Sequence, residues 1–332
     1  MFSLVLLLCS AGALVSSAPQ KTFYNVEDAH SHFEDFVQTY NKEYTNEAEK
    51  QARFEIFKNN LENINMKNKM SQSAVFGITQ FSDLTQEEFT QTFTGCVMPG
   101  GETTCSRTSL ASNATGVAAA ENFDWRNQNK VTSVKNQQQC GSCWAFSTAG
   151  TIEGQYAMKH NQLVDLSPQQ LVDCSRSNHG CHGGWMSAAI LDTAEFGGLM
   201  SWQSYPYMAS QGMCRANAGQ ITAQVTGCRN FAVASEEDLK QTLAQVGPLS
   251  IALAASSWNH YTGGIYDASM CDQNIDHAVL LVGYGTENGK PYWTIKNSWG
   301  SQWGESGYIR ISRNQNTCNL MGSGQFVTAN VQ

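Results

Sequence analysis

The sequence predicts an α+β fold, in which a helix-rich part precedes a strand-rich part. Apolar residues recur at helical spacing within residues 27–92, and again within 143–160 and 167–172. Short runs rich in Val, Ile and aromatic residues follow at 278–284, 292–296 and 308–312, as expected of strands. The chain has 332 residues, 41% of them hydrophobic and 14% charged, which is typical of a globular protein with room for two domains. Its net charge of −8 disfavours a nucleic-acid partner.

The first residues predict a secretory signal peptide over 1–18. An apolar run, FSLVLLLCSAGALV, is followed by Ser16-Ser17-Ala18, small residues that suit cleavage after Ala18. No Lys or Arg precedes the run, which departs from the usual pattern. The alternative, a membrane anchor, needs about 20 apolar residues. No later stretch approaches that length, so we expect no membrane association after the signal peptide is removed.

Residues 19–92 form the next region, which is polar and helical. Phe33, Phe36, Val37 and Tyr40 share one helix face, and a second, longer helix repeats the pattern from Arg53 to Ile64. Residues 93–120 lose this periodicity and are rich in Gly, Thr, Ser and Ala, which predicts a linker open to proteolysis. The linker contains a glycosylation sequon at Asn113. The remaining residues, 121–332, form the α+β domain.

Eleven cysteines can be counted, and one of them, Cys9, leaves with the signal peptide. In the secretory pathway the other ten can form disulfides, so a free thiol there needs a reason. Cys143 offers one, because it opens a helical pattern in the segment QQQCGSCWAF. A thiol at a helix N-terminus feels the positive end of the helix dipole, which favours the nucleophilic thiolate.

Three other interpretations of this segment compete. Cys140 and Cys143 could be a C-x-x-C redox pair, but no βαβ pattern precedes them. A zinc site could combine them with Cys174, Cys181 and His182, but no second paired motif completes it. All these cysteines could also be purely structural. We therefore expect neither a metal nor another cofactor.

A thiolate nucleophile needs a base and a group that orients the base. His277 begins one predicted strand, Asn288-Gly289 marks a tight turn, and Asn297 ends the returning strand. The hairpin places His277 and Asn297 at the same end of the ladder. Simple register leaves them about 10 Å apart, so a bulge or a loop must bring them into contact.

These motifs resemble those of the papain-like, cathepsin L-like cysteine peptidases. The matching residues are Gln137, CGSCWAF around Cys143, DHAV around His277 and KNSWG around Asn297. The resemblance implies a two-lobed fold, a helical lobe beside an antiparallel β-barrel-like lobe, with the active-site cleft between them. It also implies that Cys143 attacks the peptide carbonyl, His277 carries the proton, Asn297 orients His277, and Gln137 helps to form the oxyanion hole.

Three nearby residues carry further expectations. By similarity, Trp299 shields the His277–Asn297 hydrogen bond and Trp303 lines the leaving-group side, although ordinary core packing would also explain both. Gln138 departs from the family, which usually has a small residue there, often Gly, and this departure could alter the loop geometry.

The resemblance also predicts a substrate-binding wall. Gly183 and Gly184 lack side chains and let a peptide backbone approach. An apolar pocket for the P2 side chain is expected, with a preference for Leu, Val or Phe over Arg. The residues matched to this pocket are Trp185, Met186, Ala252, Ile275, Ala278 and Ser323.

The same resemblance implies three disulfides, Cys140–Cys181, Cys174–Cys214 and Cys271–Cys318, which leave Cys143 free. The other three cysteines stay undecided. Cys96 and Cys105 could pair with each other, or one of them could reach Cys228 and tether the linker to the peptidase domain.

Residues before the linker resemble the inhibitory propeptide of this family. Six matching positions lie near one stripe of a helix, where a plain amphipathic helix is the alternative: Glu49, Arg53, Phe57, Asn60, Ile64 and Asn68. A second motif runs from Gly77 through Thr79 and Phe81 to Asp83. The linker should cross the cleft in the direction opposite to a substrate, maturation should cut near Val117–Glu121, and acid should loosen the propeptide as carboxylates gain protons.

The function predicted is that of a cysteine endopeptidase made as a zymogen, acting on peptides and proteins as a monomer. The expected location is the secretory pathway, ending in a lysosome, another acidic vacuole or the extracellular space. A catalytically dead, peptide-binding homologue is the first alternative, which the intact Cys143, His277, Asn297 and Gln137 oppose. An exopeptidase is the second, and would need a loop or a retained chain segment that blocks the cleft.

Overall fold

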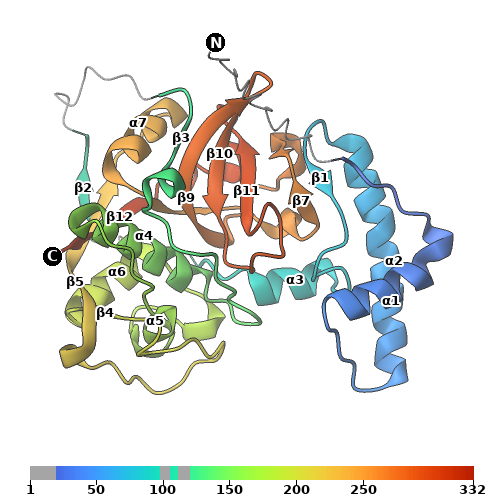
Figure 1. The fold of residues 1–332 in the computed structure, drawn as a ribbon, viewed down its shortest axis with the longest axis horizontal. Helices are drawn as coiled ribbons and strands as arrows, with labels where there is room; N and C mark the ends of the chain where they lie inside the picture. Colours follow the sequence, from blue (N-terminus) through green and yellow to red (C-terminus); the bar gives the residue numbers. More distant parts are fainter. Residues whose placement is uncertain (1–19, 98–104, 111–119) are drawn as a thin grey trace, which may run out of the picture.

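The computed structural model describes residues 20–97, 105–110 and 120–332 (Figure 1). The predicted signal peptide, Cys9, the sequon at Asn113 and most of the predicted maturation site lie outside these residues. Among the described residues, no helix combines the length and the hydrophobicity that a bilayer crossing requires.

The N-terminal region is a small helical unit, at the right in Figure 1. It contains α1 (Ala29–Thr39), α2 (Glu47–Met70), the short strand β1 (Val75–Phe76) and α3 (Gln86–Phe93). Asn46 caps α2, and Thr85 with Glu88 forms a capping box at the start of α3, so both helices begin where the sequence supplies a cap. Phenylalanines of α1 and α2 pack face to edge between the two helices, as Phe33 does with Phe57.

The first lobe of the following domain is helical. The long helix α4 (Cys143–His160) is buried along most of its length and packs against α5 (Pro168–Cys174) and α6 (Met186–Glu195). A short strand, β4 (Gly198–Met200), follows α6 and pairs with β5.

The second lobe is a mixed sheet in the strand order β2-β5-β12-β6-β9-β10-β11-β8. Its long strands are β5 (Ile221–Phe231), β9 (His277–Glu287) and β10 (Lys290–Lys296), and β2 (Ser106–Thr108) forms one edge. The other members are β6 (Leu249–Leu253), β8 (Ile265–Tyr266), β11 (Tyr308–Ser312) and β12 (Phe326–Val331). The short strand β3 (Phe123–Asp124) pairs with β9, and α7 (Glu236–Val246) packs against β9.

The helical unit docks on the sheet lobe through backbone and side-chain contacts. Strand β1 pairs with β7 (Tyr261–Gly263), and α3 lies between α2 and the two-lobed domain in Figure 1. Phe81 and Phe89 pack edge-on against Trp299. These contacts place the end of α3 directly over the junction of the two lobes.

The α+β prediction agrees with this architecture, and several predicted elements have close counterparts. The three predicted late strands correspond to β9, β10 and β11, and Asn288 and Gly289 make the tight turn with positive φ of 51° and 76°. The simple division into early helices and late strands is incomplete, because α7 lies within the strand-rich part.

Candidate active site

Cys143 is the first residue of α4, as its position in the sequence predicted. Its side chain is fully buried, and the preceding residue, Ser142, makes no side-chain cap to the helix. The backbone N–H groups of Ala278, Trp144 and Cys143 itself face the sulfur. The helix dipole and these N–H groups all stabilise negative charge on the sulfur.

His277 and Asn297 are in direct contact. His277 Nε2 lies 2.8 Å from Asn297 Oδ1, and Asn297 Oδ1 also accepts a hydrogen bond from Ser298 N. A β-bulge between Thr294 and Ile295 shifts the β9–β10 register, which brings the strand ends closer than simple pairing would. The other ring nitrogen, His277 Nδ1, is buried without a hydrogen-bond partner among the described residues. This nitrogen is therefore available to a reacting group.

Aromatic rings enclose this contact. The indole of Trp299 stacks on the His277 ring with centroids 4.8 Å apart, and Trp299 and Trp303 pack edge to face. Both tryptophans are fully buried. Trp303 belongs to the same aromatic cluster as Trp258, so a core-packing role applies to it as well.

Burial sets the protonation state of the two reactive groups while the helical unit is docked. Burial raises the pKa of Cys143 to about 12, against the opposing effect of the backbone N–H groups. Burial lowers the pKa of His277 to about 4, although the contact with Asn297 acts in the opposite direction. At neutral pH the covered site therefore holds a thiol and a neutral imidazole.

Gln137 is fully buried, and its amide already has partners. Its Nε2 donates to the backbone carbonyl of Phe93 at 3.1 Å and to that of Cys140 at 2.9 Å, while its Oε1 accepts from Ser298 Oγ. Trp299 Nε1 donates to the same Phe93 carbonyl at 3.1 Å. The end of α3 thus places a peptide carbonyl against the donor that the sequence predicted for the oxyanion hole.

The chain continues from Phe93 along the cleft. Cys96 forms an isolated parallel bridge with Gly184, Val97 N donates to Gly184 O, and Gly184 N donates to Gly95 O. On the opposite side, Gly95 N and Cys96 N both donate to the backbone carbonyl of Asp276. Residues 93–97 are therefore held between the two lobes as an extended peptide.

Gly183 and Gly184, the two glycines predicted for the substrate-binding wall, are needed for different reasons. A Cβ on Gly183, where φ is +108°, would lie 2.6 Å from Val97 Cγ2 and 2.9 Å from Gly95 O. A Cβ on Gly184 would instead collide with Asn178 and Trp144 of the same lobe. Gly183 therefore permits the approach of the cleft peptide, whereas Gly184 is required by internal packing.

The apolar residues predicted for the P2 pocket lie together. One buried cluster contains Cys143 with Trp185, Met186, Ala252 and Ala278, and Ile275 packs against this cluster. Ser323 is half-buried in the loop before β12, where its Oγ accepts from Gln325 N.

The disulfides answer the question that the sequence left open. The structure contains Cys140–Cys181, Cys174–Cys214 and Cys271–Cys318, and it joins Cys105 to Cys228, which leaves Cys96 and Cys143 as thiols. Because Cys140 bonds to Cys181, the redox-pair and zinc-site interpretations do not hold. Cys96 does not pair with Cys105, because Cys105 is bonded to Cys228. Backbone hydrogen bonds hold Cys96 in the cleft instead.

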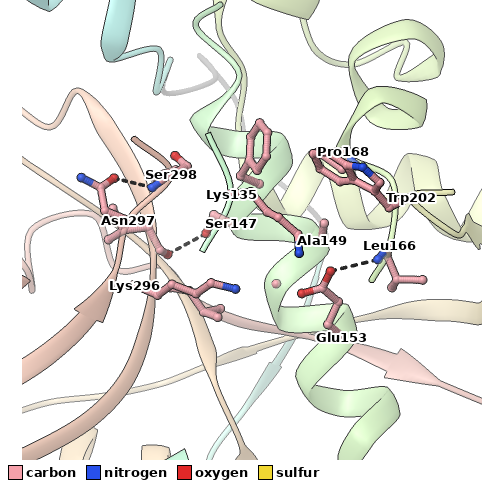
Figure 2. Close-up of a pocket in the computed structure, with 15 residues that line it drawn as sticks. Lys135, Ser147, Ala149, Glu153, Leu166, Pro168, Trp202, Lys296, Asn297 and Ser298 are labelled. Carbon is pink, nitrogen blue, oxygen red and sulfur yellow. Dashed lines mark hydrogen bonds between the residues drawn. The ribbon is translucent and has the colours of Figure 1, made fainter. Parts of the chain in front are cut away.

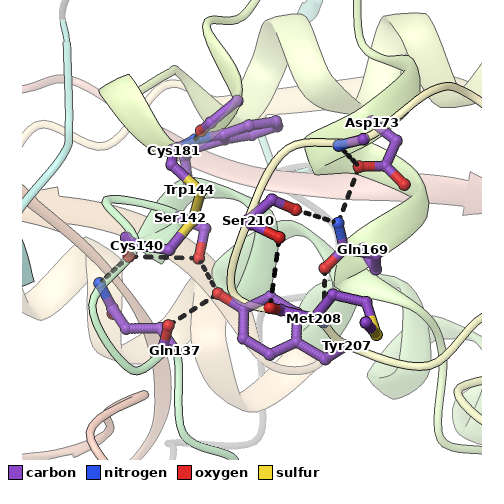
Figure 3. Close-up of a disulfide and its surroundings, with 12 residues drawn as sticks. Gln137, Cys140, Ser142, Trp144, Gln169, Asp173, Cys181, Tyr207, Met208 and Ser210 are labelled. Atoms are coloured by element: carbon purple, nitrogen blue, oxygen red, sulfur yellow. Dashed lines mark hydrogen bonds between the residues drawn. A yellow bond between two sulfur atoms is a disulfide. The ribbon is translucent and has the colours of Figure 1, made fainter.

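The Cys140–Cys181 disulfide braces the loop before Cys143 (Figure 3). Tyr207 contacts this loop from outside it: its hydroxyl donates to Gln137 O and lies 2.7 Å from Ser142 Oγ. Gln138 adopts a positive φ of 53°, a conformation that glycine adopts without strain. That geometry gives a physical reason for the small residue expected at this position.

A pocket lies behind the strand end that carries Asn297, between β10 and α4 (Figure 2). Lys296 extends into it toward Glu153 of α4, and Thr132 Oγ1 joins the two, accepting from Lys296 Nζ and donating to Glu153 Oε2. Burial lowers the pKa of Lys296 to about 8 and raises that of Glu153. This connection ties the strand of Asn297 to the helix of Cys143.

Two family models match the chain. One, the papain family of cysteine proteases, covers residues 119–328, and the other, the cathepsin propeptide inhibitor domain, covers residues 33–89. The chain belongs to the papain family. It is a cysteine protease made as a zymogen, and its N-terminal helical unit is the inhibitory propeptide.

Close relatives and solved structures agree with this membership. Viral cathepsins of nucleopolyhedroviruses are similar along nearly the whole length: that of Adoxophyes honmai nucleopolyhedrovirus is 44% identical, over 90% of each chain. The digestive procathepsin L2 proteinase of Tenebrio molitor larval midgut superposes with a TM-score of 0.85 at 36% identity, covering 91% of this chain and 99% of that one. A recombinant stem bromelain precursor gives a TM-score of 0.83 at 34% identity, over 92% and 99%.

Sequence reasoning missed several residues that surround the candidate site. Neither the Lys296–Thr132–Glu153 connection nor the Tyr207 contact was predicted, because each joins segments that lie far apart in the sequence. Asp276 was noted only as the neighbour of His277, yet its carbonyl holds the propeptide, and burial raises the pKa of its carboxyl to about 7. The signal for Asp276 was its place in the DHAV motif.

Proposed function

We propose that this papain-family protease is an endopeptidase whose nucleophile is Cys143, with His277 as its base and Asn297 as the group that orients His277. The observation that carries the proposal is the contact between His277 Nε2 and Asn297 Oδ1, which leaves His277 Nδ1 without a partner among the described residues, next to Ala278, whose backbone N–H faces the Cys143 sulfur. Removal of the propeptide would readmit water and reverse the burial that keeps both groups neutral.

In the proposed reaction, the Cys143 thiolate attacks the scissile carbonyl carbon and forms a tetrahedral intermediate. Gln137 Nε2 and the backbone N–H of Cys143 donate to its oxyanion. Protonated His277 gives its proton to the leaving amine, which leaves an acyl-enzyme. A water that loses its proton to neutral His277 then attacks the acyl-enzyme, which releases the acid and restores the Cys143 thiolate beside protonated His277. No cofactor or metal enters these steps.

We further propose that apolar side chains are preferred at P2. The buried apolar cluster around Met186 supports this, and Ser323, the position matched to the base of the pocket, carries no charge. Blocked peptides that differ only at P2 test the preference, with Leu and Phe expected to exceed Arg in kcat/KM. A Ser323→Glu variant should raise the relative kcat/KM for Arg by about tenfold, or ~1.4 kcal/mol. An unchanged Leu-to-Arg ratio in that variant would argue against a pocket at Ser323.

The activity itself is tested by titration with an epoxide inhibitor after acid activation. We expect one equivalent to attach to Cys143, and none to the Cys143→Ala variant. Cleavage of internal bonds in peptides blocked at both ends separates an endopeptidase from an exopeptidase. Absence of labelling at Cys143 would mean that the chain is a binding homologue.

We propose the remaining features from the sequence. The segment 1–18 would direct the chain into the secretory pathway, toward a lysosome, another acidic vacuole or the extracellular space, and Asn113 would carry a glycan. Four disulfides support an oxidising route. We propose that the mature protein, residues 121–332, acts as a monomer and binds neither nucleic acid nor a membrane. N-terminal sequencing of secreted material tests the cut after Ala18, and N-terminal sequencing of acid-activated material tests the cut near Val117–Glu121.

A further inference from the structure

We propose that residues 105–110 remain on the mature peptidase as a disulfide-held strand, so that release of the propeptide needs two cuts instead of one. The inference rests on the proposed maturation cut near Val117–Glu121. That cut lies after Cys105, yet Cys105 is bonded to Cys228 of the peptidase domain. Cleavage there alone would leave the propeptide covalently attached.

The segment is built into the peptidase domain by more than its disulfide. Strand β2 pairs in parallel with β5, with Ser106 opposite Arg229 and Thr108 opposite Phe231. Ala232 N then donates to Thr108 O at 2.8 Å. Cys105 Sγ lies 3.9 Å from Ser187 O of α6. The strand pairing, the disulfide and the contact with α6 therefore all join this segment to the peptidase domain.

Side-chain packing agrees with this assignment. The half-buried Leu110 packs against the large core of the sheet lobe, and Cys105 packs against the second core, which includes Met186 and Cys228. Among the described residues, the hydrogen bonds that this segment makes outside itself all go to the peptidase domain. In Figure 1, β2 lies at the edge of the molecule opposite α1 and α2. The segment therefore precedes the maturation cut in sequence but belongs to the peptidase in structure.

Loss of the segment would uncover a sheet edge. Strand β2 is the terminal strand beside β5, and without it the Arg229–Phe231 edge would present unpaired backbone groups. The disulfide also holds the strand covalently, because the Cys105–Cys228 bond persists when the chain between these two residues is cut. Both effects favour retention of the strand after maturation.

The tether also bears on inhibition. A propeptide cut only after Cys105 remains linked at an effective concentration on the order of millimolar, so it continues to occupy the cleft. Full activity then requires a second hydrolysis, between Val97, the last described residue of the cleft peptide, and Cys105. Each cut adds one water across a peptide bond, and the protease itself supplies this chemistry. The disulfide is neither oxidised nor reduced.

Intact mass of the full-length proenzyme after acid activation tests the proposal. Without reductant, the mature protein should carry the additional mass of a peptide that contains residues 105–110. Reduction and alkylation should release that peptide and lower the protein mass accordingly. A mature protein of the same mass before and after reduction, apart from the alkyl groups, would overturn the inference.

Epoxide labelling of Cys143 in the same sample separates this inference from the proposed function. Labelled protein without the peptide would refute the tethered strand and leave the peptidase assignment intact. An added acid protease can trim the proenzyme if it does not activate itself. A trimmed product that carries the peptide but no label at Cys143 would support the tethered strand and refute the peptidase assignment.

A double variant, Cys105→Ser with Cys228→Ser, supplies a matched control that leaves no unpaired thiol. It should lose the peptide on activation and show no disulfide-linked propeptide intermediate on non-reducing gels. The wild-type chain should show that intermediate early in activation. If the wild type never passes through it and its final product lacks the peptide, the two-cut route is wrong.

Discussion

The backbone carbonyl of Phe93 accepts a hydrogen bond from the side-chain amide of Gln137, with 3.1 Å between oxygen and nitrogen. Phe93 ends the last helix of the propeptide, and Gln137 is the proposed oxyanion donor. The zymogen thus occupies, with its own peptide, a donor that the reaction would use. The position of this one carbonyl links inhibition to the proposed mechanism.

Replacement of Gln137 by Ala should lower kcat of the activated enzyme by about 10²–10³, because a transition-state donor is lost. Steady-state kinetics on a blocked peptide measure this, and KM should change little. Gln138→Ala, at an exposed neighbouring side chain, is the matched control and should retain activity. A loss in Gln137→Ala of less than tenfold would count against the oxyanion role.

Alkylation of Cys143 should be strongly suppressed in the zymogen. Burial raises its pKa to about 12, which keeps the thiol protonated at pH 7, and the covered cleft also limits access. We expect labelling by iodoacetamide to be at least about 10³-fold slower before activation than after it, as followed by peptide mass mapping. Equal rates would show that the docked propeptide does not control the thiol.

Acid should weaken propeptide docking through His260, which is buried at the propeptide interface. Its Nδ1 lies 3.4 Å from Ser82 Oγ, its Nε2 has no partner among the described residues, and burial together with the nearby Lys67 ammonium lowers its pKa well below 6.5. Lys67 itself donates to Ser257 O and to Asn259 Oδ1. Protonation of His260 would place two cations together at this interface.

The sign of this effect follows from linkage. Because docking lowers the His260 pKa, its contribution to docking is complete above about pH 6.5 and is lost as the pH falls below that value. A Lys67→Gln variant should therefore need a lower pH for activation, measured as the midpoint of propeptide release in a Cys143→Ala background. The exposed Lys69→Gln is the control. A midpoint that stays the same in Lys67→Gln would remove His260 and Lys67 from the acid response.

Loss of Glu153 should destabilise the two-lobed domain. A Glu153→Ala variant leaves the buried Lys296 ammonium without its acidic counterpart, which costs about 3–5 kcal/mol in the free energy of unfolding. Denaturant unfolding of the Cys143→Ala protein measures this without self-digestion. The control is Glu195→Ala, at the exposed end of α6, with an expected change within about 0.5 kcal/mol. A cost in Glu153→Ala as small as that of the control would show that the connection adds little.

Local signals in the sequence predicted several parts of the site. The position of Cys143 at a helix start, the Asn288-Gly289 turn and the strands that carry His277 and Asn297 all depend on short-range patterns, which the folded chain retains. Pattern alone left His277 and Asn297 about 10 Å apart. The bulge within the β9–β10 pair shifts the pairing by one residue and so brings the two closer, and the Trp299 ring stacks on His277 beside the direct contact that the structure shows.

The sequence by itself determined the residue types, their order and the local elements: a nucleophile at a helix N-terminus, a base and an amide at one end of a hairpin, and a helical propeptide. Tertiary structure alone decided which distant groups meet. It joined Cys105 rather than Cys96 to Cys228, because parallel pairing of β2 with β5 sets those two residues side by side, while Cys96 is held in the cleft by Asp276 and Gly184. Such contacts depend on packing between segments 88 to 180 residues apart, which leaves no periodic trace in the sequence.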